Sequence, residues 1–299
     1  MFRKFRHLRK AMLRSLEHDV FGTAKAAAYS AILCVFPALL VLTALIAASP
    51  GGNTFRGEIR AALDEVLPAD AMALAQSYLQ NQPQRSMQVL ATAVFISTFA
   101  GMGVMLSLME GFLRAYGEDR RAWKFWHQRV LAILLIPSCL VPMGCATLFV
   151  IFGHQIELWM IDRANFELRS YVLVLWMIVR WTIAMVTCVV VLTVIYHFGT
   201  PHPNSWRWVV PGALVATVLW FAATLLFGWY VTRFADYSLV YGSLGAGIAT
   251  LVWLYITSVA VLYGGEFNAS ISPSRKHLGV PDVPGRDEIT LTSGPSPTV

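Results

Sequence analysis

The chain has 299 residues, of which 57% are hydrophobic and 13% are charged. Ordinary globular proteins carry about a quarter of their residues as charges, so this composition excludes a water-soluble enzyme. The formal net charge is +6, from 23 Lys and Arg against 17 Asp and Glu. Such an excess would suggest a nucleic-acid partner only if the basic residues formed one patch.

Six long stretches predict transmembrane helices, because a bilayer core of about 30 Å needs roughly 20 apolar residues of helix. Five of them contain no Asp, Glu, Lys or Arg, and the fourth contains one charged residue, Arg180. The predicted spans are 26–49, 87–109, 130–155, 171–198, 209–232 and 237–265. The predicted fold class is therefore all-α, a polytopic integral membrane protein with six transmembrane helices and short interfacial amphipathic helices.

The distribution of Lys and Arg predicts which span ends face the cytoplasm, since basic residues near span ends are retained there. Sixteen basic residues lie before the first span, between spans two and three, between spans four and five, or after span six. Six lie on the opposite side. Both termini are therefore predicted to be cytoplasmic. This asymmetry accounts for the basic composition, so no nucleic-acid partner is expected.

The segments outside the spans divide the chain into three regions. These are a basic amphipathic N-terminus over 1–25, the six-helix domain over 26–270, and a tail over 271–299 in which Pro, Ser, Gly and Thr are frequent. Residues 2–20 carry apolar side chains at helical spacing among basic ones, which is typical of an interfacial helix on an anionic leaflet. Residues 55–80 are predicted to form two short extracytoplasmic helices, and the tail is predicted to be disordered.

A cleaved signal peptide is an alternative interpretation of the first span. Ala47, Ala48 and Ser49 loosely resemble a small-residue cleavage site after a basic leader and an apolar run. That apolar run is longer than the roughly 7 to 15 residues of a signal-peptide core, and the leader before it is long. Both features favour a membrane span.

Arg180 is the strongest single anomaly in the sequence. It is the tenth residue of the fourth span, which places it roughly 14 Å from the start of that span and close to the midplane. Burying it costs at least about 2.5 kcal/mol, so it should face the bundle interior, a polar cavity or a carboxylate. It belongs either to a substrate pathway or to a purely structural contact. The candidate acidic partners lie near span boundaries: Glu110, Asp236 and Glu266.

Other candidates for a substrate pathway lie near span ends and at helix interruptions. Lys25 and Tyr29 flank the start of the first span, and Pro37 inside it removes one helix hydrogen bond, as in transporter helices that expose backbone groups. Small residues lie at the start of the sixth span. They could belong to the substrate pathway or could let another helix pack closely. Glu266 and Asn268 could alternatively form a polar cap where the sixth span leaves the bilayer. The candidate set is Arg180, Lys25, Tyr29, Pro37, Tyr241, Gly242, Glu266 and Asn268.

The sequence contains no pattern typical of catalysis or metal binding. Seven histidines are scattered without metal-ligand spacing, and the four cysteines lie inside apolar runs, where we interpret them as small core residues. No Walker loop, nucleophile elbow or HExxH motif occurs. We therefore expect no enzyme activity, no metal and no cofactor.

Several motifs resemble the YihY/BrkB family of bacterial inner-membrane proteins, also labelled ribonuclease BN, over roughly residues 15–270. They are Ala27-Ala28-Tyr29 with Phe36-Pro37, Arg114-Ala115-Tyr116-Gly117, Arg180-Trp181, Tyr196 to Gly199, Pro211-Gly212-Ala213 with Trp220, Tyr241 to Ala246, Trp253-Leu254-Tyr255 and Gly265 to Ala269. The chain departs from the family at Cys34, Leu113 and Ser238, where Ser, Asn and Asn are common.

The resemblance implies a six-helix bundle in the bacterial inner membrane with cytoplasmic termini, and transport of lipid or another amphipathic solute has been suggested for the family. We expect a transporter or flippase of an anionic lipid or other amphipathic solute. Its expected partners are membrane lipids, in particular anionic ones, and a small amphipathic substrate that Arg180, with Lys25, would attract. The alternatives are a non-transporting membrane scaffold or envelope-integrity factor and, third, a ribonuclease.

Overall fold

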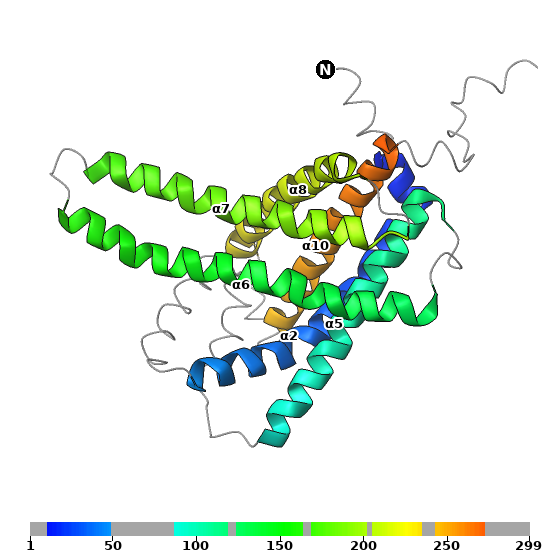
Figure 1. The fold of residues 1–299 in the computed structure, drawn as a ribbon, viewed down its shortest axis with the longest axis horizontal. Coiled ribbons are helices and arrows are strands. Elements are labelled where there is room, and N and C mark those ends of the chain that lie inside the picture. Colours follow the sequence, from blue (N-terminus) through cyan, green and yellow to red (C-terminus); the bar gives the residue numbers. More distant parts are fainter. Residues whose placement is uncertain are drawn as a thin grey trace, which may run out of the picture.

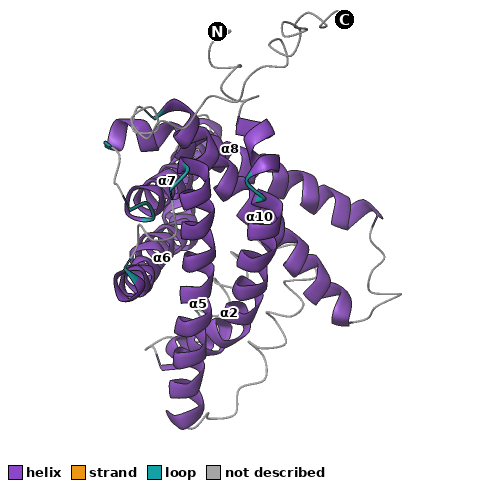
Figure 2. Cartoon of the chain, turned by 90° about the vertical axis from the view of Figure 1, so that its right-hand side faces the viewer, coloured by secondary structure: helices purple, strands orange, loops and turns teal. Residues whose placement is uncertain are grey.

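The computed structural model describes residues 11–48, 87–118, 124–163, 169–201, 205–234 and 243–272. All regular structure within these ranges is helical (Figure 2). Residues 2–10, the predicted short helices over 55–80, the predicted tail from residue 273, and the candidates Tyr241 and Gly242 lie outside the described residues.

Six long helices make up the described part of the chain (Figure 1). They are α2 (Val20–Ala48), α5 (Met87–Tyr116), α6 (Phe125–Arg163), α7 (Arg169–Phe198), α8 (Trp206–Phe234) and α10 (Ser243–Ile271). Each contains a window long and apolar enough to cross a membrane. The predicted all-α fold with six transmembrane helices is confirmed.

The helices begin and end at other residues than the charge-free spans predict. α2 begins at Val20 rather than at 26, and α5 continues to Tyr116 rather than stopping at 109. α10 runs to Ile271, so Glu266 and Asn268 lie inside the last helix instead of after it. A span boundary placed at the first charged residue ends the predicted helix too early, because the helix continues through polar residues that find partners within the bundle.

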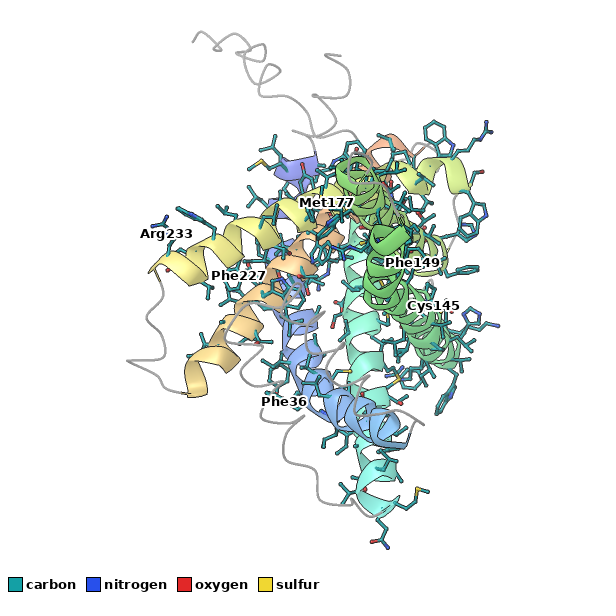
Figure 3. The ribbon with its side chains drawn as sticks, turned by 90° about the vertical axis from the view of Figure 1, so that its left-hand side faces the viewer. Phe36, Cys145, Phe149, Met177, Phe227 and Arg233 are labelled. Atoms are coloured by element: carbon teal, nitrogen blue, oxygen red, sulfur yellow. The ribbon has the colours of Figure 1, made fainter. Side chains whose placement is uncertain are left out.

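The six helices pair into three antiparallel hairpins, α2 with α5, α6 with α7, and α8 with α10. Neighbouring hairpins also touch, since α10 packs against α2 and α5, α7 packs against α8, and α5 packs against α6. Figure 3 shows the α8–α10 hairpin, with Phe227 and Arg233, extending to one side, and α6 and α7, with Phe149 and Met177, on the other.

The hairpins converge where α2, α6 and α8 begin and where α5, α7 and α10 end. We call this the terminal end, and the opposite end the far end. Close packing of small, aliphatic and aromatic residues makes the main core there: Val20, Ala24, Ala27, Leu108, Phe112, Val191, Leu192, Ile195, Tyr196, Val209, Ala213, Ala216 and Leu262. A smaller cluster of Phe227, Val231 and Ala249 joins α8 to α10 at the far end. The hairpins are thus tied together mainly at one end.

Most of the helix surface faces outward. Only between 11% and 33% of each spanning window is buried within the chain, and many large apolar side chains are exposed. At the terminal end, Trp126 at the start of α6 and Trp206 and Trp208 at the start of α8 are exposed, and the Arg129 guanidinium lies 3.4 Å from the Phe125 ring centroid. Exposed aromatic and basic residues at helix ends are typical of a membrane–water interface.

α2 changes direction about halfway along its length (Figure 1). Pro37 lies inside this helix, and the neighbouring Phe36 lies near the bend in Figure 3. Proline lacks the N–H that would bond to the preceding turn, and its ring crowds that turn, so a bend is the expected result.

A short helical stretch over residues 11–17 precedes α2. Asp19 separates the two with a positive φ of 51°, and its carboxylate accepts a hydrogen bond from the Gly22 backbone N–H at 3.2 Å, which caps α2. Arg14 and Ser15 are buried toward the bundle, whereas the apolar side chains are exposed: Met12, Leu13 and Leu16. The described part of the predicted interfacial helix therefore turns its apolar side away from the protein.

Candidate functional site

A polar site lies at the terminal end and is built around residues 264–268 of α10, which we call the α10 hub. Four of its five residues are buried: Gly264, Gly265, Glu266 and Asn268. Each of the four faces a different part of the bundle. The hub therefore links α5, α7, α8 and the segment before α2 to one short stretch of α10.

The two glycines let neighbouring helices approach the α10 backbone. A Cβ atom on Gly264 would clash with the Tyr196 hydroxyl of α7 and would lie 2.6 Å from the Gly212 carbonyl oxygen of α8. A Cβ atom on Gly265 would lie 2.8 Å from the Phe112 ring of α5. Glycine is required at these positions because any larger residue would force three helices apart.

Asn268 binds the backbone of α8 and is fully buried. Its Oδ1 atom accepts a hydrogen bond from the Gly212 N–H at 2.7 Å, and its Nδ2 atom donates to the Val209 carbonyl at 2.9 Å. Between the two partners lies Pro211, which has no N–H. The side-chain amide therefore holds the first turns of α8 where the regular helix pattern is interrupted.

Glu266 contacts a residue that is 248 positions away in the chain. Its Oε1 atom lies 2.6 Å from Nδ1 of His18, at the break that precedes α2. The Glu266 side chain is 1% exposed and that of His18 is 21% exposed. Within the described residues, no donor lies within hydrogen-bond distance of Glu266 Oε2. A buried carboxylate is thus joined to a histidine that borders the surface.

Arg114 near the end of α5 forms a second polar cluster beside the first. Its guanidinium lies 2.7 Å from Glu110 and 3.8 Å from Asp19, and it donates to the Thr23 hydroxyl at 3.4 Å. α5 then ends at Gly117, whose φ of 73° suits a glycine helix terminus. This cluster ties the end of α5 to the start of α2.

Tyr196 near the end of α7 contacts α10 beside the hub. Its hydroxyl donates to the Val261 carbonyl of α10 at 2.6 Å, and its ring meets the Phe112 ring edge to face with centroids 5.2 Å apart. Both residues belong to the main core. α5, α7 and α10 are therefore fixed to one another by an aromatic pair and a part-buried hydrogen bond.

Arg180 does not belong to the hub. It lies on α7 about 24 Å along the helix from Tyr196, at 1.5 Å per residue. In the spanning window Leu173–Phe198 it lies about 10 Å from the first residue and about 27 Å from the last. The side chain is half-buried, and the next residue, Trp181, packs against Phe221 of α8. Arg180 is therefore an intramembrane charge in the far half of the bundle, farther from the middle of the window than the predicted span implied.

The candidate pathway residues do not gather into one site. Lys25 and Tyr29 are exposed on the outer side of α2 near the terminal end, and Pro37 lies in the bend of that helix. Arg180 lies on another hairpin at another depth. Of the candidates that the structure describes, only Glu266 and Asn268 lie in the same site, and the prediction that they form a simple polar cap misses their contacts with His18 and α8.

Three residues of the site were missed by sequence reasoning: His18, Arg114 and Tyr196. The partners of His18 and Tyr196 are far away in the chain or are backbone carbonyls, so no local spacing marks these two residues. Arg114 has a local partner, Glu110, but its contacts with Asp19 and Thr23 join it to a distant segment. The prediction that the cysteines are all core residues is wrong for Cys145, which is exposed. Among the described residues, no group of three or more His, Cys, Asp and Glu is arranged to hold a metal ion.

Comparisons with known proteins agree on the family. The family model described as virulence factor BrkB matches residues 11–284. The ribonuclease-like protein YfkH of Bacillus subtilis strain 168 is 27% identical over 271 residues, which cover 90% of this chain and 96% of YfkH. No solved structure matches the chain.

Longer relatives match over part of their length. UPF0761 membrane proteins of Stenotrophomonas maltophilia strain R551-3 and Xanthomonas campestris pv. campestris strain B100 are each 26% identical over 269 residues. The match covers 88% of this chain and 60% of each of those proteins. With the family model spanning most of its length and six helices fit to cross a bilayer, the chain belongs to the YihY/BrkB family of multi-pass membrane proteins.

Proposed function

We propose that the protein is a transporter or flippase of an anionic lipid or another anionic amphipathic solute. The observation that carries this proposal is Arg180, a half-buried cation inside a membrane-spanning helix. A charge at that depth is costly unless it serves a polar pathway or a structural contact. Its place in the far half, away from the buried core at the terminal end, favours the pathway.

Two cationic positions at different depths suit the movement of an anionic group across the bilayer. Lys25 is exposed on α2 near the terminal end, and its long side chain can reach the headgroup region there. Arg180 lies in the far half of the bundle. In this mechanism the anionic headgroup first meets Lys25, with Tyr29 one turn along, and then Arg180. The acyl chains stay in contact with the outward apolar faces.

The movement that transport requires is supplied by the hairpins. They are held together at the α10 hub and touch less toward the far end, so they can rock about the hub. The bend of α2 at Pro37 gives one hairpin a second point of adjustment. Rocking would alternately expose Arg180 to the membrane surface and shield it.

We place the terminal end on the cytoplasmic side of a bacterial inner membrane. Sixteen of the 23 Lys and Arg residues lie in segments that connect to this end, and basic segments are retained in the cytoplasm. The leaflet on that side is rich in anionic lipid, which would attract Lys25 and the basic N-terminus.

Replacing Arg180 with Gln tests the proposal in reconstituted vesicles. We expect the movement of fluorescent phosphatidylglycerol between leaflets to slow at least about tenfold, because about 1.4 kcal/mol of lost stabilisation has that effect on a rate. Arg180→Lys should keep part of the rate, since it keeps the charge. A second set of vesicles measures uptake of lysophosphatidylglycerol from water and separates a lipid flippase from a solute carrier.

Arg233→Gln is the matched control, because Arg233 is also on a spanning helix but is exposed near its far end (Figure 3). It should leave the rate unchanged. If Arg180→Gln transports as fast as the wild type, or if neither substrate moves in wild-type vesicles, the arginine is a packing residue and the scaffold alternative is favoured.

Ribonuclease activity is the alternative that the name of the ribonuclease-like protein YfkH suggests. We expect the purified chain to leave RNA intact, because the described residues gather no metal-ligating group and the sequence carries no nucleophile motif. Incubation with labelled RNA and gel analysis checks this expectation. Cleavage that disappears with one point substitution would contradict it.

A further inference from the structure

The contact between His18 and Glu266 is short and isolated from other ion pairs. The 2.6 Å between Glu266 Oε1 and His18 Nδ1 is within hydrogen-bond distance. Within the described part of the chain, His18 is the only basic side chain within ion-pair distance of Glu266. The two residues therefore behave as one unit.

The surroundings of Glu266 make an uncompensated charge on it unfavourable. Glu266 is 1% exposed, and its Oε2 atom finds no donor among the described residues. If the pair lost its proton, a carboxylate would remain buried beside a neutral ring, and an uncompensated buried charge is strongly unfavourable. With one proton, the pair is neutral overall, whichever of the two residues carries it.

Several other charged groups lie at the terminal end. On the segment before α2, Arg14 is buried one turn ahead of His18, and Glu17 is exposed. On α5, Arg114 pairs with Glu110 and Asp19, and Glu118 follows that helix. The remaining charged residues on the helices packed against α10 are exposed: Lys25 on α2, and Arg207 and Arg233 on α8.

His18 supplies the route between water and the buried carboxyl group. Its side chain is 21% exposed, and its ring has a second nitrogen besides the one that faces Glu266. Histidine takes up and releases protons in the physiological pH range, which makes it suited to relay a proton. His18 is the more exposed member of the pair and lies at the terminal end.

We propose that Glu266 and His18 form a proton-binding site that couples proton movement to the proposed transport. Glu266 is part of the α10 hub, whose neighbours Gly265 and Asn268 hold α5 and α8. A change in charge at Glu266 therefore acts at the point about which the hairpins move. The coupling rests on the proposed function, but binding of the proton does not.

The first experiment titrates the full purified chain in lipid nanodiscs and needs no transport. Infrared difference spectra follow the C=O band of a protonated carboxyl group as pH changes. The wild type should show a titrating band that disappears in Glu266→Gln. In His18→Gln its midpoint should move by at least about one pH unit, a tenfold change in proton affinity. Glu17→Gln and His197→Gln, also at the terminal end, should leave the band unchanged.

A wild-type spectrum that matches Glu266→Gln across the pH range would overturn the proposal. If Glu266→Gln does not fold, the shift in His18→Gln decides the question, because an unshifted band would overturn it as well. The second experiment imposes a pH gradient on transporting vesicles. The gradient should accelerate phosphatidylglycerol movement in the wild type and not in Glu266→Gln. Equal effects in both would overturn the coupling, whereas a wild type that moves no substrate would refute the transport function and leave the titration to decide the site.

Discussion

Replacing Gly264 with Val is expected to destabilise the bundle strongly. The new side chain would meet the Tyr196 hydroxyl, the Gly212 carbonyl and the Cβ of Ala216, which belong to two different helices. Overpacking of this kind costs about 3 kcal/mol when the neighbours are backbone atoms that cannot rotate away. The thermal unfolding temperature in detergent and the yield of monodisperse protein should both fall.

Gly247→Val is the control on the same helix. No atom lies within 4 Å of a Cβ built on Gly247, and valine is a slightly better helix former than glycine. Its unfolding temperature should equal or exceed that of the wild type. If the two variants lose stability equally, the close approach of α10 to α7 and α8 is not what holds the terminal end together.

The transmembrane helices could be predicted because the bilayer imposes a local rule. A span must be apolar over about 20 consecutive residues, and that property is visible in any window of the sequence. The same rule made Arg180 visible as an exception. It could not set helix ends, since Glu110 and Arg114 continue α5 by pairing with each other.

The α10 hub could not be predicted, because its contacts follow no local rule. His18 and Glu266 are 248 residues apart, and no sequence motif links one to the other. Asn268 binds backbone atoms, which every residue possesses. The similarity to family motifs at Gly265 to Ala269 marked the segment as important, and the three-dimensional contacts explain why those residue types are needed.

Lys25 illustrates a different limit. Sequence position placed it beside Tyr29 and Pro37 on one helix, which suggested a shared site with Arg180. Helical spacing does put Lys25 and Tyr29 on one face, but that face points away from the bundle. Which side of a helix faces its neighbours depends on the packing of all six helices, and an almost uniformly apolar sequence carries little information about it.

Asn268→Ala is expected to loosen α8 from α10. The substitution removes the acceptor of the Gly212 N–H and the donor to the Val209 carbonyl at a fully buried position. Losing both bonds and leaving a buried N–H without a partner should cost about 2 to 4 kcal/mol. The unfolding midpoint in SDS titrations measures this loss, and hydrogen exchange at the start of α8 should become faster.

Two further variants identify the cause of the effect. Asn268→Asp keeps the acceptor but places a carboxylate oxygen beside the Val209 carbonyl, so it should be at least as unstable as Asn268→Ala. Ser270→Ala is the matched control, because the Ser270 hydroxyl of this half-buried residue donates to the nearby Phe267 carbonyl, at 2.7 Å, within the same helix. Ser270→Ala should lower the free energy of unfolding only slightly. If Asn268→Ala is as stable as the wild type and hydrogen exchange in α8 is unchanged, the regular helix hydrogen bonds alone hold these turns. Asn268 would then be a packing residue rather than the link between α8 and α10.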